Sequence, residues 1–471
     1  MPVDKGAPLI PAAVAAPTSV PTPLAPAGRP VVLPPSPPTA AAARHPEGGV
    51  KETVESILVA FILAFVFRAF VVEAFVIPTG SMAPTLLGAH MRFTCTDCGY
   101  QYTVNYSTGA DMNIPSRAPG TIGQDVRCPN CGYAVPGASE IDEDTREKPP
   151  VHYGDRILVL KYRYLMHDPR RWDVVVFKAP DLVENAPRYT TNYIKRLIGR
   201  PGESIVMLDG DIYASTAVPA GDLTDPVARA AFLRTFKVQP KPAYAQDALW
   251  RDVYDNDRLP HLPEGVGPGQ RGGDPWRQPW TPVAAGGGGA AGGGGWDVGQ
   301  NLPGAARGRA RVFHFDDLGG GGKLGFDPTA NPETFAFTDY LAYDQIRGGT
   351  RFVPRNVVGD LKLACFYTRQ AGDGPFAMTL TKRDDVFVAR ATPGKVQVDW
   401  TRQNGQPVKT FGPVDVPELA GGSPVRLEFM NVDYRVSLRV NGREVLTSGE
   451  AYVPTPDRVI ELEREEAGRA G

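Results

Sequence analysis

Histidine and cysteine are scarce in this chain of 471 residues, which holds six histidines and five cysteines. No two histidines have the HExxH spacing that places two zinc ligands and a general base on one helix face, so a zinc-dependent hydrolase is disfavoured. Five cysteines are too few for a fold built on disulfides. A net charge of -2 provides no basic surface field, so nucleic acid is not expected among the partners.

Glycine (52) and proline (47) are abundant, and they cluster. Residues 1–50 are rich in proline and alanine without any period, which is typical of a disordered tail with no core to bury. Residues 214–308 are predicted to be an irregular Gly/Pro-rich linker, in which 225–237 could form one helix. Residues 463–471 are predicted to be a short tail.

One long apolar run, Ile57–Ile77, interrupts this composition. As a helix its 21 residues would measure about 31 Å, enough to span a bilayer. A buried soluble helix is the alternative, but residues 57–67 show no polar stripe. Arg68 and Glu73 lie near the end, where long side chains can reach the interface. Residues 51–77 are therefore predicted to be a transmembrane anchor.

Four of the cysteines form two CxxC pairs, each followed by Gly-Tyr. This spacing makes a tight turn that can aim two thiolates at one ion, and two such turns complete a tetrahedral site. Two disulfides are the alternative, favoured in an oxidising compartment. Residues 93–149 are therefore predicted to be a zinc-ribbon-like insert, with structural zinc on Cys95, Cys98, Cys128 and Cys131.

The remaining sequence predicts a mainly β protein. Short β runs separated by Gly, Pro and Asp occur at 154–160, 173–177 and 193–198, within a β domain assigned to residues 78–92 and 150–213. Further strands, among them a hairpin around Asn441-Gly442, predict an antiparallel β-sandwich-like domain over residues 309–462.

Ser81 follows the apolar run, between Gly80 and Met82, in a stretch bounded by two prolines. Serine is a weak nucleophile that needs a base, and no Ser-His-Asp set is evident. Lys195 has apolar neighbours in a predicted strand, and burial among them would lower the pKa of a lysine toward use as a base. A surface serine and a solvent-facing lysine are the alternatives.

Residues 81–86, Ser-Met-Ala-Pro-Thr-Leu, resemble the nucleophile box of the type I signal peptidase family. Residues 193–203 resemble its general-base box, and Gly154-Asp155-Arg156 with residues 173–177 is similar to the strand box between them. The likeness covers about residues 52–92 and 150–213.

The resemblance implies a catalytic dyad in which neutral Lys195 takes the proton of Ser81, with no cofactor for catalysis. It also implies that the backbone N–H of Ser81 and the hydroxyl of Thr79 hold the oxyanion. The implied substrates are secretory preproteins with small residues before the cleavage site. The implied location is the inner (cytoplasmic) membrane, crossed once, with the catalytic domain outside the cytoplasm and the lipid bilayer as a partner.

The sequence also departs from the family. Ser81 and Lys195 are farther apart than usual, and Trp172 stands where the family has a small residue. The last family box, a Gly-Asp-Asn turn followed by Ser-x-Asp-Ser-Arg, is not found. Two hypotheses follow: an active Ser/Lys signal peptidase, or a catalytically inactive or truncated membrane-anchored binding protein on the same scaffold. A weak likeness of residues 425–446 to laminin-G-like sandwiches leaves the ligand of that domain open.

Overall fold

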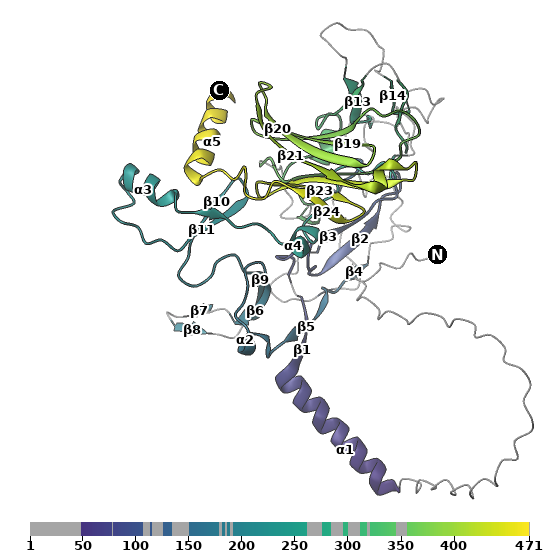
Figure 1. Ribbon diagram of the computed structural model, residues 1–471. Helices are drawn as coiled ribbons and strands as arrows, with labels where there is room; N and C mark the ends of the chain where they lie inside the picture. The colour runs from purple at the N-terminus through teal and green to yellow at the C-terminus, as the bar shows by residue number, and fades with distance from the viewer. Residues whose placement is uncertain are drawn as a thin grey trace, which may run out of the picture. The chain divides into compact units, whose positions relative to one another are not determined.

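The computed structural model of the chain falls into two compact units, Met1–Ala64 and Phe65–Gly471 (Figure 1). The predicted tail at residues 1–48 lies outside the part that is described. The described residues are 49–77, 79–106, 114, 126–133, 150–178, 181–183, 186–188, 192–260, 276–283, 295–299, 311–317, 321–344 and 356–470.

The apolar run begins as helix α1 (Val50–Val66) and continues as the π-helix η1 (Phe67–Val71). Among the described residues, Val50–Val71 is the one helix long and apolar enough to cross a membrane. The prediction of a helix through Ile77 is wrong at its C-terminal end, because strand β1 (Val72–Val76) follows and pairs with β5 (Arg156–Leu160). Glu73 pairs there with Lys161 at 2.9 Å.

Small antiparallel sheets follow β1, and they agree with the predicted β runs to within about two residues. β6 (Val174–Lys178) pairs with β9 (Asn192–Arg196), and β10 (Ser204–Leu208) pairs with β11 (Asp211–Ser215), which also pairs with β12 (Lys237–Val238). The short helix α2 (Arg163–Met166) follows β5, and β7 (Asp181–Val183) pairs with β8 (Ala186–Arg188).

The cysteine-bearing region is built on a three-stranded sheet with the order β3-β2-β4. Its strands are β2 (His90–Thr94), β3 (Gln101–Asn105) and β4 (Val151–His152). β2 ends directly before Cys95, so it joins the stretch around Ser81 to the first cysteine pair.

The predicted linker at 214–308 contains regular structure, which corrects the expectation of an irregular segment. Helix α3 (Pro226–Leu233) begins at Asp225, whose side chain accepts hydrogen bonds from the N–H groups of Val227 and Ala228. The other elements here and just beyond are α4 (Ala243–Asp247), β13 (Trp280–Val283), β14 (Trp296–Asp297), β15 (His314–Phe315) and β16 (Lys323–Phe326).

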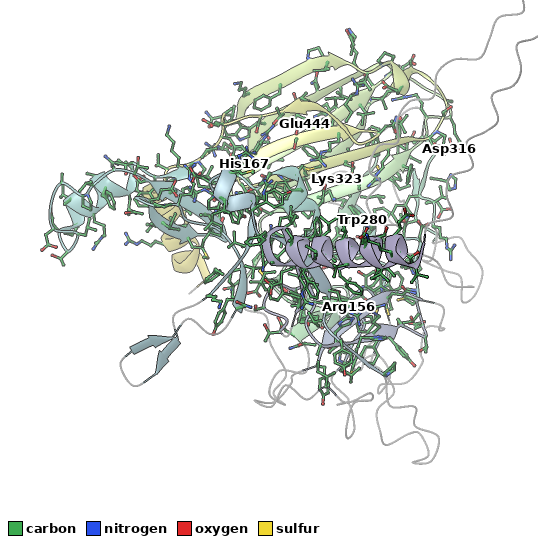
Figure 2. All side chains as sticks on the ribbon, turned by 90° about the horizontal axis from the view of Figure 1, so that it is seen from below. Arg156, His167, Trp280, Asp316, Lys323 and Glu444 are labelled. Carbon is green, nitrogen blue, oxygen red and sulfur yellow. The ribbon has the colours of Figure 1, made fainter. Side chains whose placement is uncertain are left out.

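These strands form two small pairs, β13 with β16 and β14 with β15. Figure 2 labels Trp280 and Lys323 in the first pair. The glycine run of the predicted linker lies outside the described residues, except for Gly295. Two 3-10 turns then follow, η3 (Pro332–Thr334) and η4 (Ala342–Asp344).

Two four-stranded antiparallel sheets dominate the C-terminal part, and their side chains meet in one hydrophobic cluster. The first sheet has the order β17-β22-β23-β24 and the second the order β18-β19-β20-β21. Asn441, at positive φ, and Gly442 make the turn between β23 and β24, as predicted. The strands, in chain order, are Leu361–Tyr367, Phe376–Lys382, Asp385–Thr392, Lys395–Arg402, Pro407–Asp415, Val425–Val432, Arg435–Val440 and Arg443–Thr447.

The chain ends in helix α5 (Pro456–Ala470), where a short tail was predicted from residue 463. The segment is rich in Glu, Arg and Ala, which favour helix, and proline is well tolerated in a first helical turn. The tail prediction is therefore wrong in its secondary structure.

Candidate active site

Ser81 lies in a tight turn. The N–H of Ala83 donates to the carbonyl of Gly80 at 3.0 Å, which makes Ser81 the first central residue of a β-turn. Ser81 is exposed, whereas the next residue, Met82, is buried against Ile194. The turn therefore leaves Ser81 exposed, while the buried side chain of Met82 fixes the turn to the protein.

Asp155 closes the loop that carries Ser81. Its carbonyl accepts from the N–H of Ile77 at 2.9 Å, and its carboxylate accepts from the N–H of Leu87 at 2.8 Å. In return its own N–H donates to the carbonyl of Leu87 at 2.9 Å. A Cβ at Gly154 would overlap the carbonyl oxygen of Ile77, so glycine is required for this approach. The sequence placed Asp155 in a strand box but gave no sign of this role.

Lys195 reaches Ser81 from strand β9. Its Nζ donates to Ser81 Oγ at 2.7 Å and to the carbonyl of Ile194 at 2.9 Å. The ammonium also lies 5.6 Å from the ring centroid of Tyr193. The structure thus brings together two residues that are 114 positions apart in the sequence. A hydroxyl hydrogen-bonded to an amine has the arrangement of a nucleophile and its base.

Thr79 lies two residues before Ser81 and is exposed. It belongs to the same loop, where the backbone of Thr79 and Gly80 runs close to Gly88. A Cβ at Gly88 would lie 2.6 Å from the N atom of Gly80. The chain therefore turns back between these residues, so that Gly88 packs against the backbone of Thr79 and Gly80. The side chains of Thr79 and Ser81 stay exposed.

Arg196 gives a second link between β9 and this loop. Its guanidinium donates to Thr85 Oγ1 at 3.1 Å and to the carbonyl of Trp172 at 3.1 Å. Trp172 is buried and has a φ of 74°, a conformation that favours glycine. The backbone N–H of Trp172 donates to the carbonyl of Leu197 at 2.7 Å. Trp172 is thus held in a strained conformation against the strand that carries Lys195.

A buried ion pair fixes the turn after β9. Arg171 contacts both carboxylate oxygens of Glu203 at 2.7 Å, and the N–H of Arg200 donates to the same carboxylate at 2.8 Å. Although burial opposes the shift, the hydrogen bonds from Arg200 and Arg171 lower the pKa of Glu203. Glu203 therefore stays ionised and holds the Arg200–Glu203 turn closed.

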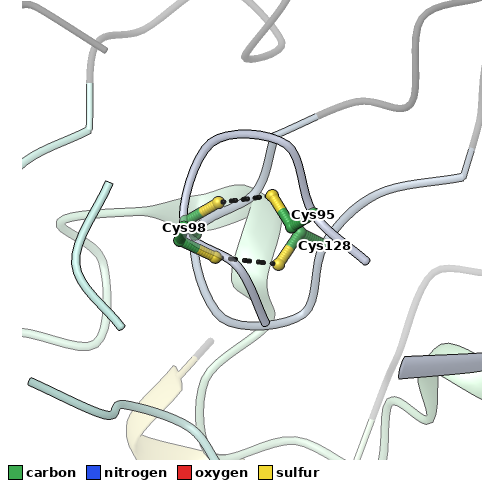
Figure 3. A group of neighbouring side chains, drawn as sticks. Cys95, Cys98 and Cys128 are labelled. Carbon is green, nitrogen blue, oxygen red and sulfur yellow. Dashed lines mark hydrogen bonds between the residues drawn. The ribbon is translucent and has the colours of Figure 1, made fainter. Parts of the chain in front are cut away.

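The four paired cysteines converge on one point (Figure 3). In each pair the first cysteine accepts at its carbonyl from the glycine N–H four residues later, at 2.9 Å in both. Gly99 and Gly132 have positive φ, which the turn requires. Across the pairs, the sulfurs of Cys95 and Cys131 are 3.7 Å apart and those of Cys98 and Cys128 are 3.6 Å apart.

All four thiols are free and buried. Hydrogen bonds from Cys128 and Cys131 lower the pKa of Cys95 and of Cys98. Neighbouring sulfurs and burial raise the pKa of Cys131. The amide of Asn130 also donates to Cys98 Sγ at 3.6 Å. Four sulfurs within 4.8 Å of one another are the donor set of a tetrahedral site.

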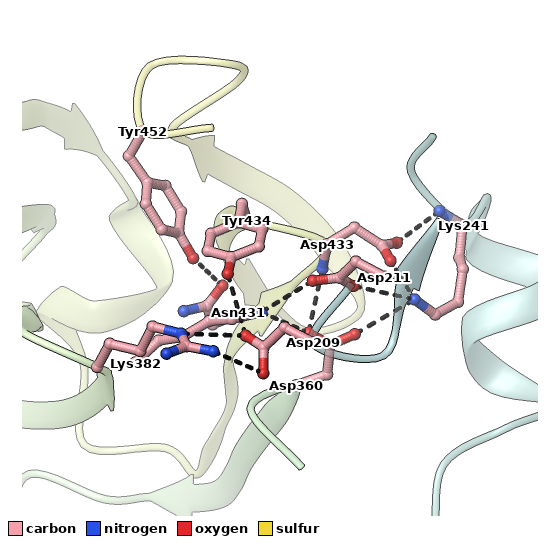
Figure 4. Close-up of polar contacts among 10 residues, drawn as sticks. Asp209, Asp211, Lys241, Asp360, Lys382, Asn431, Asp433, Tyr434 and Tyr452 are labelled. Carbon is pink, nitrogen blue, oxygen red and sulfur yellow. Dashed lines mark hydrogen bonds and ion pairs between the residues drawn. The ribbon is translucent and has the colours of Figure 1, made fainter. Parts of the chain in front are cut away.

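A second group of acidic residues does not make a cation site. Asp211, Asp360 and Asp433 lie close together, but two lysines lie among them (Figure 4). Lys382 Nζ is 3.2 Å from Asp211 and 3.2 Å from Asp360, and Lys241 contacts Asp433. Two of the three negative charges are therefore balanced by ammonium groups of the chain itself.

Comparison with known proteins points to the region that holds Ser81 and Lys195. A family model described as signal peptidase, peptidase S26, matches residues 50–103 and 142–247. These segments contain Ser81, Asp155 and Lys195, whereas Cys128 and Cys131 lie in the gap between them.

The similar proteins are signal peptidases. Signal peptidase I of Rickettsia bellii (strain OSU 85-389) is 26% identical over 159 residues, which are 34% of this chain and 37% of that protein. Signal peptidase I of Rickettsia typhi is 28% identical over 164 residues, 35% of this chain and 43% of that protein. Signal peptidase I of Rickettsia akari is 26% identical over 216 residues, 43% of this chain and 61% of that protein.

The chain spans less than two thirds of the length of these relatives. No solved structure matches it. The family model covers the part that holds the Ser81 loop and β9. Residues 50–103 and 142–247 are thus the part of the chain that is similar to signal peptidases, peptidase S26.

Proposed function

We propose that this protein is a membrane-anchored serine endopeptidase that removes N-terminal signal peptides from secreted preproteins. The observation that carries the proposal is the 2.7 Å contact between Lys195 Nζ and Ser81 Oγ, inside the region that matches signal peptidases. The alternative of an inactive scaffold is not favoured, because the relatives named above are all signal peptidases I.

The proposed reaction is acyl transfer through Ser81. Neutral Lys195 takes the hydroxyl proton as Ser81 Oγ bonds to the scissile carbonyl carbon. The backbone N–H of Ser81 and the hydroxyl of Thr79 donate to the oxyanion. When the C–N bond breaks, Lys195 returns its proton to the leaving amine. Lys195 then takes a proton from water as the water oxygen bonds to the ester carbon, and it gives that proton to Ser81 Oγ as the acyl C–Oγ bond breaks, which releases the carboxylic acid product.

The proposed substrates are secretory preproteins with small residues before the cleavage site. Helix Val50–Val71 would anchor the chain in the inner membrane, with the catalytic residues outside the cytoplasm. The apolar length of this helix supports the anchor, and the membrane and orientation follow from the family resemblance. The exposed turn around Ser81 would meet an extended substrate at the membrane surface.

We further propose that Cys95, Cys98, Cys128 and Cys131 bind one structural zinc ion. The repeated turns, the convergence of four buried sulfurs and the Asn130 hydrogen bond support this ligand set. Zinc would join the two CxxC turns and stabilise the sheet that β2 continues from the Ser81 loop. The two C-terminal sheets are proposed to form a sandwich that packs through their shared cluster.

Substitution of the dyad tests the proposed activity. We expect Ser81→Ala and Lys195→Ala each to abolish cleavage of a preprotein by the full chain in liposomes, by about 1,000-fold or more. Ser423→Ala and Lys178→Ala, at exposed positions, are the matched controls and should cleave like wild type. Normal processing by either dyad variant would overturn the assignment.

Metal analysis tests the zinc site. We expect about one zinc ion per purified chain, and none after the double substitution Cys95→Ser and Cys128→Ser. Cys365→Ser, outside the cluster, should keep its zinc. Four cysteines that resist alkylation in a metal-free, unfolded and unreduced chain would instead show two disulfides.

A further inference from the structure

The loop that carries Ser81 has a neighbour from far along the chain. Tyr343, in the 3-10 turn η4, is 2% exposed. Its hydroxyl accepts a hydrogen bond from the N–H of Gly88 at 3.0 Å. A Cβ at Gly80 would lie 2.6 Å from the same hydroxyl oxygen and would overlap the ring. Tyr343 therefore packs on Gly80, the residue before Ser81, and also accepts a hydrogen bond from Gly88, where the loop returns.

We propose that Tyr343 is a positioning residue for Ser81, and that the four-cysteine module, here residues 93–106 and 126–133 with their sulfur cluster, holds Tyr343 in place. This inference rests on the proposed function, because it concerns the geometry of the same serine. Tyr343 lies outside residues 50–103 and 142–247, the part of the chain that the family model matches. It therefore comes from a part of the chain beyond the family match.

The contacts of Gly88 explain why the tyrosine matters. Its N–H donates to Tyr343, and its carbonyl contacts the Nδ1 atom of buried His90 at 2.8 Å. A side chain at Gly88 would overlap the backbone of Thr79 and Gly80, and a side chain at Gly80 would overlap the Tyr343 ring. Without the Tyr343 ring, Gly80 would border a void, and the buried N–H of Gly88 would lose its acceptor. Both changes would loosen the turn that sets the distance from Ser81 Oγ to Lys195.

Residues 333–343, the segment that contains Tyr343, pack on the cysteine module. Tyr340 and Ala342 belong to the same buried cluster as the four cysteines. Arg127, next to Cys128, pairs with Glu333 at 3.3 Å, and both side chains are largely buried. The two ends of this contact, Glu333 and Tyr343, lie ten residues apart in the chain.

Arg251 ties the intervening residues together. Its guanidinium donates to the carbonyls of Tyr340 and Phe335, the latter at 3.0 Å. The rings of Phe335 and Tyr340 lie against each other, with centroids 4.7 Å apart. A continuous set of contacts therefore runs from the Cys128 turn to the residue before Ser81.

Kinetics of Tyr343 variants test the positioning role. In the full chain in liposomes, Tyr343→Ala should lower kcat about 10- to 100-fold with KM nearly unchanged, because the serine is misplaced while substrate contacts remain. Tyr343→Phe keeps the ring and loses the hydroxyl, so its kcat should fall only about fivefold. Tyr452→Ala removes a similarly buried tyrosine from the C-terminal cluster and should keep kcat per folded molecule.

Amide hydrogen exchange supplies a readout that does not depend on activity. A peptide that covers Ser81 and Gly88 should exchange faster in Tyr343→Ala than in Tyr452→Ala. If the wild-type chain fails to cleave preproteins, the proposed function fails, and this exchange result still decides whether Tyr343 holds the loop. Unchanged exchange, or a kcat equal to that of Tyr452→Ala, would overturn the positioning role.

A double-mutant cycle tests the link to the module. Cys128→Ser should lower kcat and speed exchange in the same peptide, and adding it to Tyr343→Ala should lower kcat by much less than the product of the two single effects. Effects that multiply, or a Cys128→Ser variant with wild-type kcat and exchange, would show that the module does not act through Tyr343.

Discussion

The surroundings of Ser81 and the C-terminal sheets are built in opposite ways. Around Ser81 the buried apolar cluster consists of Ile77, Met82 and Ile194. The two C-terminal sheets share a cluster with 22 buried members among the described residues. The loop geometry near Ser81 depends instead on polar contacts of Asp155, Arg196 and Tyr343.

The difference separates stability from geometry. Apolar burial stabilises a fold in proportion to area and has no direction, whereas hydrogen bonds fix the positions of particular atoms. The C-terminal sheets therefore supply much of the folding free energy, and the polar contacts decide where Ser81 lies. Substitutions in the two regions should affect different measurements.

A core substitution in the C-terminal sheets should give the largest effect on stability. Phe387 is fully buried between Trp400 and Tyr452, with ring centroids 5.8 and 4.7 Å away. We expect Phe387→Ala to lower the free energy of unfolding by about 3–5 kcal/mol, through lost burial and the cavity that remains. Urea unfolding of the full chain in detergent measures this effect.

Kinetics of Phe387→Ala, measured below its unfolding transition, test whether the C-terminal core also affects the geometry around Ser81. We expect kcat per folded molecule to stay within about twofold of wild type, because Phe387 and the residues around Ser81 belong to different buried clusters. Phe366→Ala, at an exposed position, is the matched control for stability. A large fall in kcat at full folding would show that the C-terminal core also sets the geometry of the site.

Substitution of Asp155 should lower kcat and leave the stability nearly unchanged, the reverse of the expected result for Phe387. Asp155→Ala removes the acceptor of the Leu87 N–H, and we expect kcat to fall about 10-fold, corresponding to about 1.4 kcal/mol. The global unfolding midpoint should change little. Asp155→Asn keeps an oxygen acceptor and should recover most of the activity. Equal losses in the two variants would show that the charge of Asp155 matters, and not its hydrogen bond.

The buried ion network should give an effect that is seen only as a pH dependence of stability. Burial raises the pKa of Asp211 to about 7, with Asp360 and Asp433 adding to the rise and Lys382 and Lys241 opposing it. Three carboxylates face two ammonium groups, so a proton on Asp211 makes the network neutral. Because this pKa is higher in the folded than in the unfolded chain, the contribution to stability is full below about pH 4 and is lost as pH rises through about 7.

We therefore expect the wild-type chain to be less stable at pH 8 than at pH 5, by roughly 1–3 kcal/mol from this group. Asp211→Asn carries a neutral side chain at both pH values and should lose most of that difference. Asp415→Asn, at an exposed position, should keep it. An identical pH dependence in wild type and Asp211→Asn would assign it to another group.

Local sequence patterns predicted most of the elements. Alternating apolar residues predicted the C-terminal strands, and the repeated CxxC-Gly-Tyr turns predicted the convergence of four sulfurs. The pairing of Ser81 with Lys195 was expected from short family motifs, and the structure places the two side chains in contact. Their roles in catalysis stay a proposal.

Other features depend on contacts between distant residues. The change from helix to strand at Val72 coincides with pairing with β5, whereas apolar residues continue on both sides of Val72 and give no local signal for the change. Tyr343 is 262 residues beyond Ser81 and has no motif around it. Asp155 looks like an ordinary strand residue, and its role follows only from the approach of Ile77 and Leu87.

The reciprocal hydrogen bonds between Leu87 and Asp155 mark a natural boundary for rearranging the protein. The stretch from Gly88 to Gly154 joins the Ser81 loop at these two residues. Because its ends are already joined, changing the length of this stretch alters the entropy of loop closure only slowly. A chimera joined at Leu87 and Asp155 would exchange the cysteine-bearing stretch while these hydrogen bonds are kept, and would show how much of the loop geometry comes from the stretch itself.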